Sequence, residues 1–262
     1  MNTQQQTKFK ILLLGDTCVD AYQYGTVERI SPEAPVPIFT PSHSDTRKGM
    51  SWNVHSNLLN LGCDVDHHAG IRSCKKTRYI DLKSKQQILR IDEDQISKPI
   101  NFIWDPLWLN SYHAVVISDY DKGSITYTII DSILDMYTGP VFIDTKKTDL
   151  ARFSKIKENE NPIVKINEKE YNSRTSGGAG VIVTKGKRGA SYNGVDYLAP
   201  HTEVFDVCGA GDTFLAALCY NYIQTKDIPT AIKFANIAAS VTVKHIGVYA
   251  PTLEEIEDAS NR

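Results

Sequence analysis

The sequence predicts an α/β protein with a doubly wound parallel sheet and a small antiparallel β flap attached to it. Short Val- and Ile-rich runs recur along the chain, helix-type segments separate most of them, and two strand-like stretches break this alternation. Continuous apolar strands that alternate with helices are typical of a parallel sheet covered on both faces. A length of 262 residues fits one domain of this class, spanning 1–262.

The strands and helices follow one another in a regular order. We expect buried strands at 8–15, 114–120, 140–145, 162–167 and 180–186. Helices are expected at 51–62, 124–137, 212–224 and 230–247. Residues 35–40 and 77–92 are strand-like and partly polar, and we expect them to form the flap. The alternative for these two stretches is an extended edge hairpin with no role in binding.

Composition excludes several classes of protein. Lys plus Arg number 29 and Asp plus Glu 31, so the net charge of −2 supplies no basic excess for nucleic-acid phosphates. No apolar run approaches the roughly 18 to 20 residues of a membrane span, and the polar start argues against a signal peptide. The five cysteines are an odd number without CxxC spacing, which favours reduced thiols over zinc or disulfides. We therefore expect a cytoplasmic protein with no nucleic-acid or membrane partner.

The most informative stretch is VFDVCGAGDTFLAAL at 204–218, where a glycine-rich turn leads into a helix near Asp212. Glycines there let the backbone approach an anion, and the free N–H groups of the first helical turn point at it. Asp212 is then either a helix-capping residue or a base that deprotonates a hydroxyl beside a bound phosphate. No Walker A loop occurs, and no GxGxxG follows the first strand.

GAGDT before a long apolar helix resembles the C-terminal signature of the ribokinase-like (PfkB) carbohydrate kinases. Further segments resemble this family's signatures, in the family's order and over nearly the whole chain: GDTCVDAYQYG at 15–25, KGMSWNVHSNLLNLG at 48–62, NEKE at 167–170, VTKGKRGA at 183–190 and FANIAASVTVKHIGV at 234–248. The resemblance implies a ribokinase-like fold and phosphorylation of a small sugar or sugar phosphate by ATP with Mg²⁺. Dependence on a monovalent cation is left open.

The resemblance also assigns roles to residues of this chain. Asp212 becomes the catalytic base, and the backbone that stabilises the transferred phosphate belongs to Gly209, Ala210 and Gly211. The residues expected at the sugar are Asp20, Gly49 and Asn53. The nucleotide and its phosphates are assigned to Asn167, Glu170, Thr184, Gly186, Gly189 and Asn236, with Glu170 acting on magnesium indirectly.

A narrower resemblance concerns the acceptor. ERISPEAPVPIF at 28–39 resembles a stretch of the heptose 7-phosphate kinases of lipopolysaccharide synthesis, as do 86–94, 118–126 and 142–153. This implies transfer to the anomeric hydroxyl of a sugar that already carries a phosphate. That phosphate needs Lys or Arg, and the candidates are Arg90, Lys122 and Lys146, each of which could equally be a surface cation. A proline-stiffened loop is the alternative explanation of 28–39.

Three departures from the family pattern leave alternatives open. A few tens of residues appear to be missing after residue 69, Met50 stands where the second glycine of Gly-Gly is usual, and Ala21 replaces the Arg of Asp-Arg-Tyr. The missing stretch and Met50 favour a catalytically silent sugar- or nucleotide-binding protein of the same fold, and a kinase for another sugar or a nucleoside is a further alternative.

Three smaller expectations complete the analysis. His67-His68 and Cys74 lack a fourth metal ligand at usable spacing, so we expect a surface turn at the two histidines. Trp104 and Trp108 are four residues apart, a helix-face pattern typical of core. Flap strands have exposed edges in a monomer and related kinases often pair their flaps, so we expect a homodimer.

Overall fold

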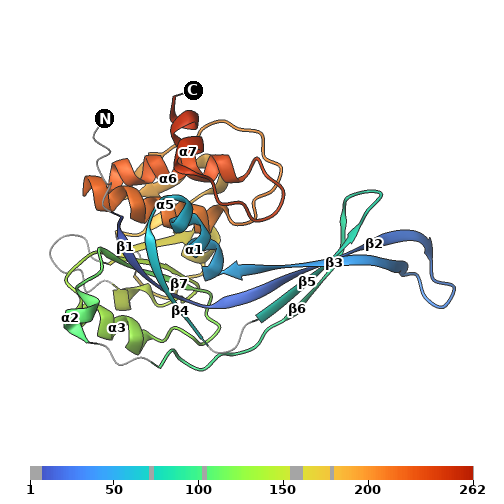
Figure 1. Cartoon of the computed structure of the whole chain (residues 1–262), viewed down its shortest axis with the longest axis horizontal. Helices are drawn as coiled ribbons and strands as arrows, with labels where there is room; N and C mark the ends of the chain where they lie inside the picture. The colour runs from blue at the N-terminus through green and yellow to red at the C-terminus, as the bar shows by residue number, and fades with distance from the viewer. Residues whose placement is uncertain (1–7, 71–73, 102–104, 154–161, 178–179, 262) are drawn as a thin grey trace.

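The computed structural model describes residues 8–70, 74–101, 105–153, 162–177 and 180–261. Its body is an eight-stranded sheet in the order β12-β11-β10-β9-β8-β7-β1-β4 (Figure 1). The strands are β1 (Lys10–Gly15), β4 (Asp64–Ala69), β7 (Ala114–Asp119), β8 (Val141–Thr145), β9 (Ile163–Asn167), β10 (Ile182–Thr184), β11 (Ala190–Tyr192) and β12 (Val195–Tyr197). From β4 to β10 all neighbours are parallel, and β11 and β12 add an antiparallel end.

Helices cover both faces of this sheet (Figure 1). One face carries α1 (Ser51–Asn60), α5 (Ala210–Thr225), α6 (Ile228–Thr242) and α7 (Leu253–Ser260). The other face carries α2 (Pro106–Leu109) and α3 (Tyr127–Met136), while the short α4 (Glu168–Asn172) follows β9 directly. Single 3-10 turns lie at Leu150–Phe153 and Gly186–Arg188. The doubly wound α/β fold expected from the sequence is confirmed.

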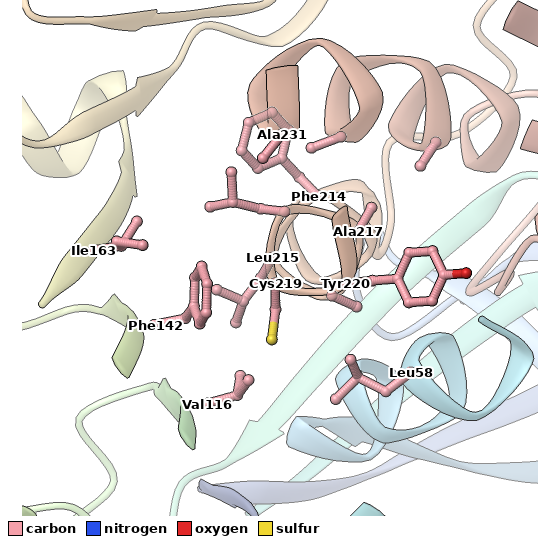
Figure 2. Close-up of a cluster of buried hydrophobic side chains, with 14 of the residues drawn as sticks. Leu58, Val116, Phe142, Ile163, Phe214, Leu215, Ala217, Cys219, Tyr220 and Ala231 are labelled. Carbon is pink, nitrogen blue, oxygen red and sulfur yellow. The ribbon is translucent and has the colours of Figure 1, made fainter. Parts of the chain in front are cut away.

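The strands are apolar without alternation because each face of the sheet packs against helices. On β7, Val116 packs toward α5 while its neighbour Val115 packs toward α3. Figure 2 shows Leu215 and Cys219 of α5 beside Val116 and Phe142 of the sheet, all of them buried. Burying one such side chain stabilises the fold by about 1.5 to 3 kcal/mol. The long helix α5, which begins at the glycine-rich turn, is therefore held rigidly against the sheet.

The flap is a second, four-stranded sheet that projects from the body (Figure 1). Its strands are β2 (Thr17–Ile30), β3 (Pro37–Met50), β5 (Cys74–Asp81) and β6 (Gln87–Glu93), in the order β3-β2-β5-β6. The stretches 35–40 and 77–92 lie in it as expected, but β2 and β3 are longer than the sequence pattern indicated. The two outer pairs are antiparallel, whereas β2 and β5 run parallel because both strands leave the same edge of the body.

One expectation was wrong. His67 and His68 do not lie in a surface turn; they belong to β4, which pairs with β1 at the edge of the main sheet. His67 packs edge-on against the Trp52 ring, and its Nε2 lies 2.9 Å from Ser51 Oγ. The polar sequence DVDHHA did not indicate a strand, because β4 is an edge strand that pairs only with β1 within the described residues. Trp108 packs against the core as expected, while Trp104 lies outside the described residues.

None of the helices among the described residues is long and apolar enough to cross a membrane. The same part of the chain contains no group of three or more His, Cys, Asp or Glu side chains that could hold a metal ion by themselves.

Candidate active site

A cavity of about 810 Å³ opens where β8, β9 and β10 end and α5 begins. In parallel sheets, ligands bind at this carboxyl edge of the strands. Eleven of the residues singled out from the sequence line the cavity: Lys146, Asn167, Glu170, Thr184, Gly186, Gly189, Gly209, Ala210, Gly211, Asp212 and Asn236. Segments far apart in the sequence therefore converge on one site.

The glycine-rich turn shapes the cavity wall beside α5. Gly209 is the N-cap residue of this helix and has a φ of +80°, a left-handed conformation that favours glycine. No side chain caps the helix at Gly209, and the Ala210 N–H donates to the Val207 carbonyl at 3.3 Å, so the N–H groups of Gly211 and Asp212 are the ones available to an anion. Because α5 is 16 residues long and buried, its N-terminus is both rigid and positively polarised.

The Asp212 carboxylate faces other side chains across the site. Its Oδ2 accepts a hydrogen bond of 2.9 Å from Asn53 Nδ2, and its Oδ1 accepts one of 2.8 Å from the Tyr120 hydroxyl. The Asp212 carboxylate is thus engaged with neighbouring elements and does not cap α5.

Burial changes the acid–base behaviour of Asp212, which is only 7% exposed. Loss of solvent raises the pKa of its carboxyl to about 6, since burial disfavours the charged form. The hydrogen bonds from Asn53 and Tyr120 and the charge of Lys165 act in the opposite direction, while Asp144 adds to the increase. A carboxyl with this pKa is ionised at neutral pH and still basic enough to take a proton from a hydroxyl.

A buried ion pair lies beneath the glycine-rich turn, and the sequence analysis missed it. Lys165 Nζ of β9 lies 2.6 Å from Asp144 Oδ2 of β8 and donates to the Gly211 carbonyl at 3.2 Å. Lys165 is 3% exposed, and burial raises the pKa of Asp144. A lysine in the middle of the apolar run PIVKIN was the available signal, because a charge on a buried strand requires a partner.

The NEKE segment folds as a capping box at the start of α4. Asn167 Oδ1 accepts a hydrogen bond from the Glu170 N–H at 2.9 Å, and Glu170 Oε2 accepts one from the Asn167 N–H at 2.8 Å. The other Glu170 oxygen pairs with Lys146. With both of its oxygens engaged, Glu170 fits the expected indirect role at magnesium, which commonly keeps several waters and binds through substrate phosphates.

The far end of the cavity is lined by glycines and apolar side chains. Gly186 and Gly189 have φ values of +59° and +85°, and a side chain on Gly189 would collide with the Tyr197 carbonyl. Asn236 Nδ2 donates to that carbonyl at 2.8 Å, which ties α6 to β12. The apolar lining residues here are Ala199, Pro200, Val204, Val207, Ala239 and Val243. This end suits a flat, largely apolar group.

The three residues expected at the sugar lie together at the base of the flap, beside Asp212. Asp20 Oδ1 pairs with Arg78 Nη1 at 2.5 Å. A side chain at Gly49 would collide with the Asp20 carboxylate and the Cys18 sulfur, so glycine is required there. Asn53 connects this group to Asp212 through its hydrogen bond to that carboxylate.

One face of the flap carries a cluster of charges that we call the inner face, because it looks toward the glycine-rich turn. Strand register places its members in adjacent rows: Asp20, Asp45, Arg47, Lys76, Arg78, Arg90 and Asp92. The Tyr22 ring lies between the guanidinium groups of Arg47 and Arg78, at 5.2 and 5.3 Å. Arg47 also reaches the body, where Nη1 lies 3.1 Å from the position a Cβ on Gly247 would take. Arg47 and Arg78 were not singled out from the sequence.

The three cations expected at a distal phosphate occupy different places. Arg90 lies on the inner face, opposite Arg78 in the strand register, and binds Asp92. Lys122 Nζ lies 2.6 Å from Asp94 Oδ2, just beyond the end of β6. Lys146 lines the cavity and pairs with Glu170 there, and its expected role at a distal phosphate stays a prediction.

Comparison with known proteins identifies the class that this fold and site define. The profile of the pfkB family of carbohydrate kinases matches residues 113–256, and the chain belongs to this family.

Among curated proteins, the chain is similar to the Bifunctional protein HldE of a Nitratiruptor species. The two are 32% identical over 303 residues, which cover 96% of this chain and 65% of that protein. HldE of Campylobacter jejuni (strain RM1221) is 30% identical over 303 residues, covering 96% and 64%. The chain thus spans about 65% of the length of the first of these relatives. An alignment of 303 positions exceeds the 262 residues of this chain, in agreement with a shortened stretch.

Solved structures agree on the fold. The ribokinase of Thermotoga maritima matches with a TM-score of 0.69 at 15% identity, over 97% of this chain and 100% of that one. The Arabidopsis thaliana ribokinase complexed with ribose and ATP gives a TM-score of 0.70 at 16% identity, over 96% and 98%. The ribokinase-like fold is therefore confirmed.

Proposed function

We propose that this protein transfers the γ-phosphate of ATP to a sugar phosphate, with heptose 7-phosphate as acceptor and its anomeric hydroxyl as the reacting group. The observation that carries the proposal is the buried Asp212 carboxylate beside the free N-terminus of α5. This pairing of a base with an anion-binding turn supports phosphoryl transfer to a hydroxyl. The similarity to HldE proteins and the cations of the flap support the choice of acceptor.

In this proposal the chemical step is short. Asp212 accepts the proton of the anomeric hydroxyl as its oxygen attacks the γ-phosphorus, and the bond from that phosphorus to the β–γ bridging oxygen breaks to release ADP. The N–H groups at the start of α5 stabilise the charge on the transferred phosphate. Magnesium bound to the nucleotide supplies further charge neutralisation, and Asn167 and Glu170 would organise its surroundings.

The acceptor fits the space between the flap and the turn. Asp20 and Asn53 offer hydrogen bonds to sugar hydroxyls beside the base, while Gly49 leaves room for the Asp20 carboxylate. A phosphate on the far end of the sugar would meet Arg47 and Arg78, whose guanidinium groups suit bidentate binding of phosphate oxygens. Ala21 stands where the heptose 7-phosphate kinases usually have an arginine, and these two arginines supply the positive charge that is missing there.

The experiment is an ADP-release assay with ATP and Mg²⁺ over a panel of sugars and sugar phosphates. We expect turnover on heptose 7-phosphate and a loss of at least about a hundredfold in Asp212→Asn, which keeps the shape of the side chain but is not basic. Calorimetric titration should show that the variant still binds ATP. Retained turnover in Asp212→Asn contradicts the assignment of the base. Binding of ATP without ADP release on any acceptor favours a silent protein.

The same assay tests the distal phosphate. Arg47→Met should raise the KM for the sugar phosphate about tenfold or more and leave the KM for ATP unchanged, because a charge-assisted contact is lost. Lys75→Met is the matched control, since Lys75 lies on the opposite face of the flap and is exposed. Equal efficiency on phosphorylated and free heptose would refute the phosphate site and leave a general sugar kinase.

A further inference from the structure

Tyr120 occupies a position between the flap and the base that the proposed chemistry has not used. It follows β7 directly, and its hydroxyl donates to Asp212 Oδ1 at 2.8 Å. Asn53 donates to the other carboxylate oxygen at 2.9 Å. The orientation of the carboxylate is thus defined from two sides by donors on different elements. Of these donors, the sequence singled out only Asn53, and it did so as a residue at the sugar.

The backbone of Tyr120 is itself anchored. Its N–H donates to Asp16 Oδ2 at 2.9 Å, and the same carboxylate accepts hydrogen bonds from the N–H groups of Lys122 and Ser124 at 3.1 and 3.2 Å. Asp16 is 1% exposed and follows β1. A buried carboxylate with three backbone donors holds the turn after β7 in a single conformation.

The ring of Tyr120 packs against the place where the flap joins the body. Its neighbours there are Cys18 of β2, Met50 of β3 and Cys74 of β5, all of them buried. Two ammonium groups also lie near the ring, Lys76 Nζ of the flap at 5.9 Å and Lys146 Nζ of the cavity at 5.5 Å from its centroid. One side chain therefore contacts the flap, the cavity and the base.

We propose that Tyr120 is a positioning residue for Asp212: its hydroxyl directs the carboxylate toward the acceptor hydroxyl, and its ring ties that orientation to the base of the flap. This inference rests on the proposed function for its catalytic consequence. Its structural consequence is a hydrogen bond that stabilises the ionised Asp212, and this consequence does not depend on the proposed function.

The effect of this hydrogen bond on the pKa of Asp212 can be separated from the effects of the charged groups around it. Asp144 from β8 and Lys165 from β9 face the carboxylate, Asn53 from α1 and Tyr120 donate to it, and Lys76 and Lys146 lie beyond the Tyr120 ring. Tyr120→Phe removes one donor and leaves the ring and all of these charges in place. A donor to the ionised form lowers the pKa of a carboxyl, so its removal should raise the pKa of Asp212.

The kinetic test compares Tyr120→Phe with wild type over a range of pH. We expect kcat to fall about tenfold, the KM for ATP to stay unchanged, and the acidic limb of the kcat/KM profile to move up by about one pH unit. Tyr137→Phe is the matched control: its buried hydroxyl donates to the Tyr112 carbonyl at 3.0 Å, in the core beneath the sheet. That variant should move neither kcat nor the profile. An unchanged profile and kcat in Tyr120→Phe overturn the proposal.

A second arm does not depend on catalysis. Urea unfolding from pH 4 to 8 is measured for wild type, Asp212→Asn, Tyr120→Phe and the double variant. The stability difference caused by Asp212→Asn reports the pKa of Asp212, and this pKa should rise by about one unit in the Tyr120→Phe background. An unmoved pKa overturns the proposal even if the kinase is active. A raised pKa in a protein that phosphorylates no sugar supports the hydrogen bond and counts against the proposed function alone.

Discussion

At the scale of single residues, Asp212 has to remain ionised in a place that disfavours charge. Its carboxylate is buried against the first turn of α5, where water is largely excluded. Two neutral donors and Lys165 offset part of this cost, yet the pKa stays raised at about 6. A raised carboxyl pKa means that the folded state binds protons more tightly than the unfolded chain, so function at this site reduces stability.

This balance predicts a pH-dependent gain in stability for Asp212→Asn. Below about pH 4 the carboxyl is protonated in both folded and unfolded states, and the two proteins should be equally stable. Between about pH 4 and 6 wild type loses stability because the Asp212 carboxyl ionises in the unfolded chain while it stays protonated in the folded protein. Above pH 6 the variant should be more stable by on the order of 2 to 3 kcal/mol. Urea unfolding at pH 4 and pH 8 measures the difference. Equal stability at pH 8 would show that the ionised carboxylate is fully compensated.

The site residues differ in how far the sequence could reveal them. Gly209, Asp212 and Glu170 stand in local motifs, whose spacing alone places them at a helix start or in a capping box. Tyr120 and Arg78 act through partners 92 and 58 residues away in the chain, at Asp212 and Asp20. Contacts of this kind depend on strand register and on how the flap meets the body, which a single sequence does not specify.

At the scale of elements, the junction between β3 and α1 carries one of the three departures from the family pattern, Met50. Met50 is the N-cap residue of α1 and has a φ of +58° with a ψ of −127°, a region that only glycine adopts without strain. Its side chain is nevertheless buried, against Cys18, Cys74 and the Tyr120 ring. The backbone therefore keeps a shape suited to the usual glycine, while the methionine fills the space at the base of the flap.

The strained backbone at Met50 predicts that the usual order of stability of alanine and glycine is reversed at this position. Met50→Ala and Met50→Gly both remove the buried side chain, but only glycine relieves the backbone strain. We expect Met50→Gly to be more stable than Met50→Ala by about 1 to 2 kcal/mol, although glycine is ordinarily the less stable residue. Urea unfolding of the two variants gives the sign directly. Greater stability of Met50→Ala would mean that the positive φ carries no cost at this position.

Strands with a continuous apolar sequence were predictable, whereas strands whose position depends on pairing with other strands were not. The apolar strands β1, β7, β8 and β9 lie where the sequence indicated, since burial on both faces leaves a continuous hydrophobic run. The edge strand β4 and most of β2 and β3 are polar or mixed, because each has a face or an edge in solvent. Their positions follow from pairing with β1 and with each other.

At the scale of the whole molecule, the flap stands away from the body with both of its sheet edges, β3 and β6, unpaired within the described chain (Figure 1). Its inner face carries the charged rows beside the active site. The opposite face, which we call the outer face, exposes apolar side chains: Val19 is 38%, Leu89 52% and Ile91 42% exposed. Unpaired edges and exposed apolar side chains on one small sheet favour association with another surface.

We therefore predict a homodimer in which two flaps pack through their outer faces. Light scattering at micromolar concentration should give a mass of twice 29.3 kDa for wild type. The double substitution Leu89→Lys with Ile91→Lys should give a monomer, because it places charges in the apolar contact. Leu107→Lys is the matched control, since Leu107 of α2 is 86% exposed and lies on the body, and it should remain dimeric. A wild-type mass near 29.3 kDa would contradict the dimer, and a dimeric double variant would place the contact on another surface.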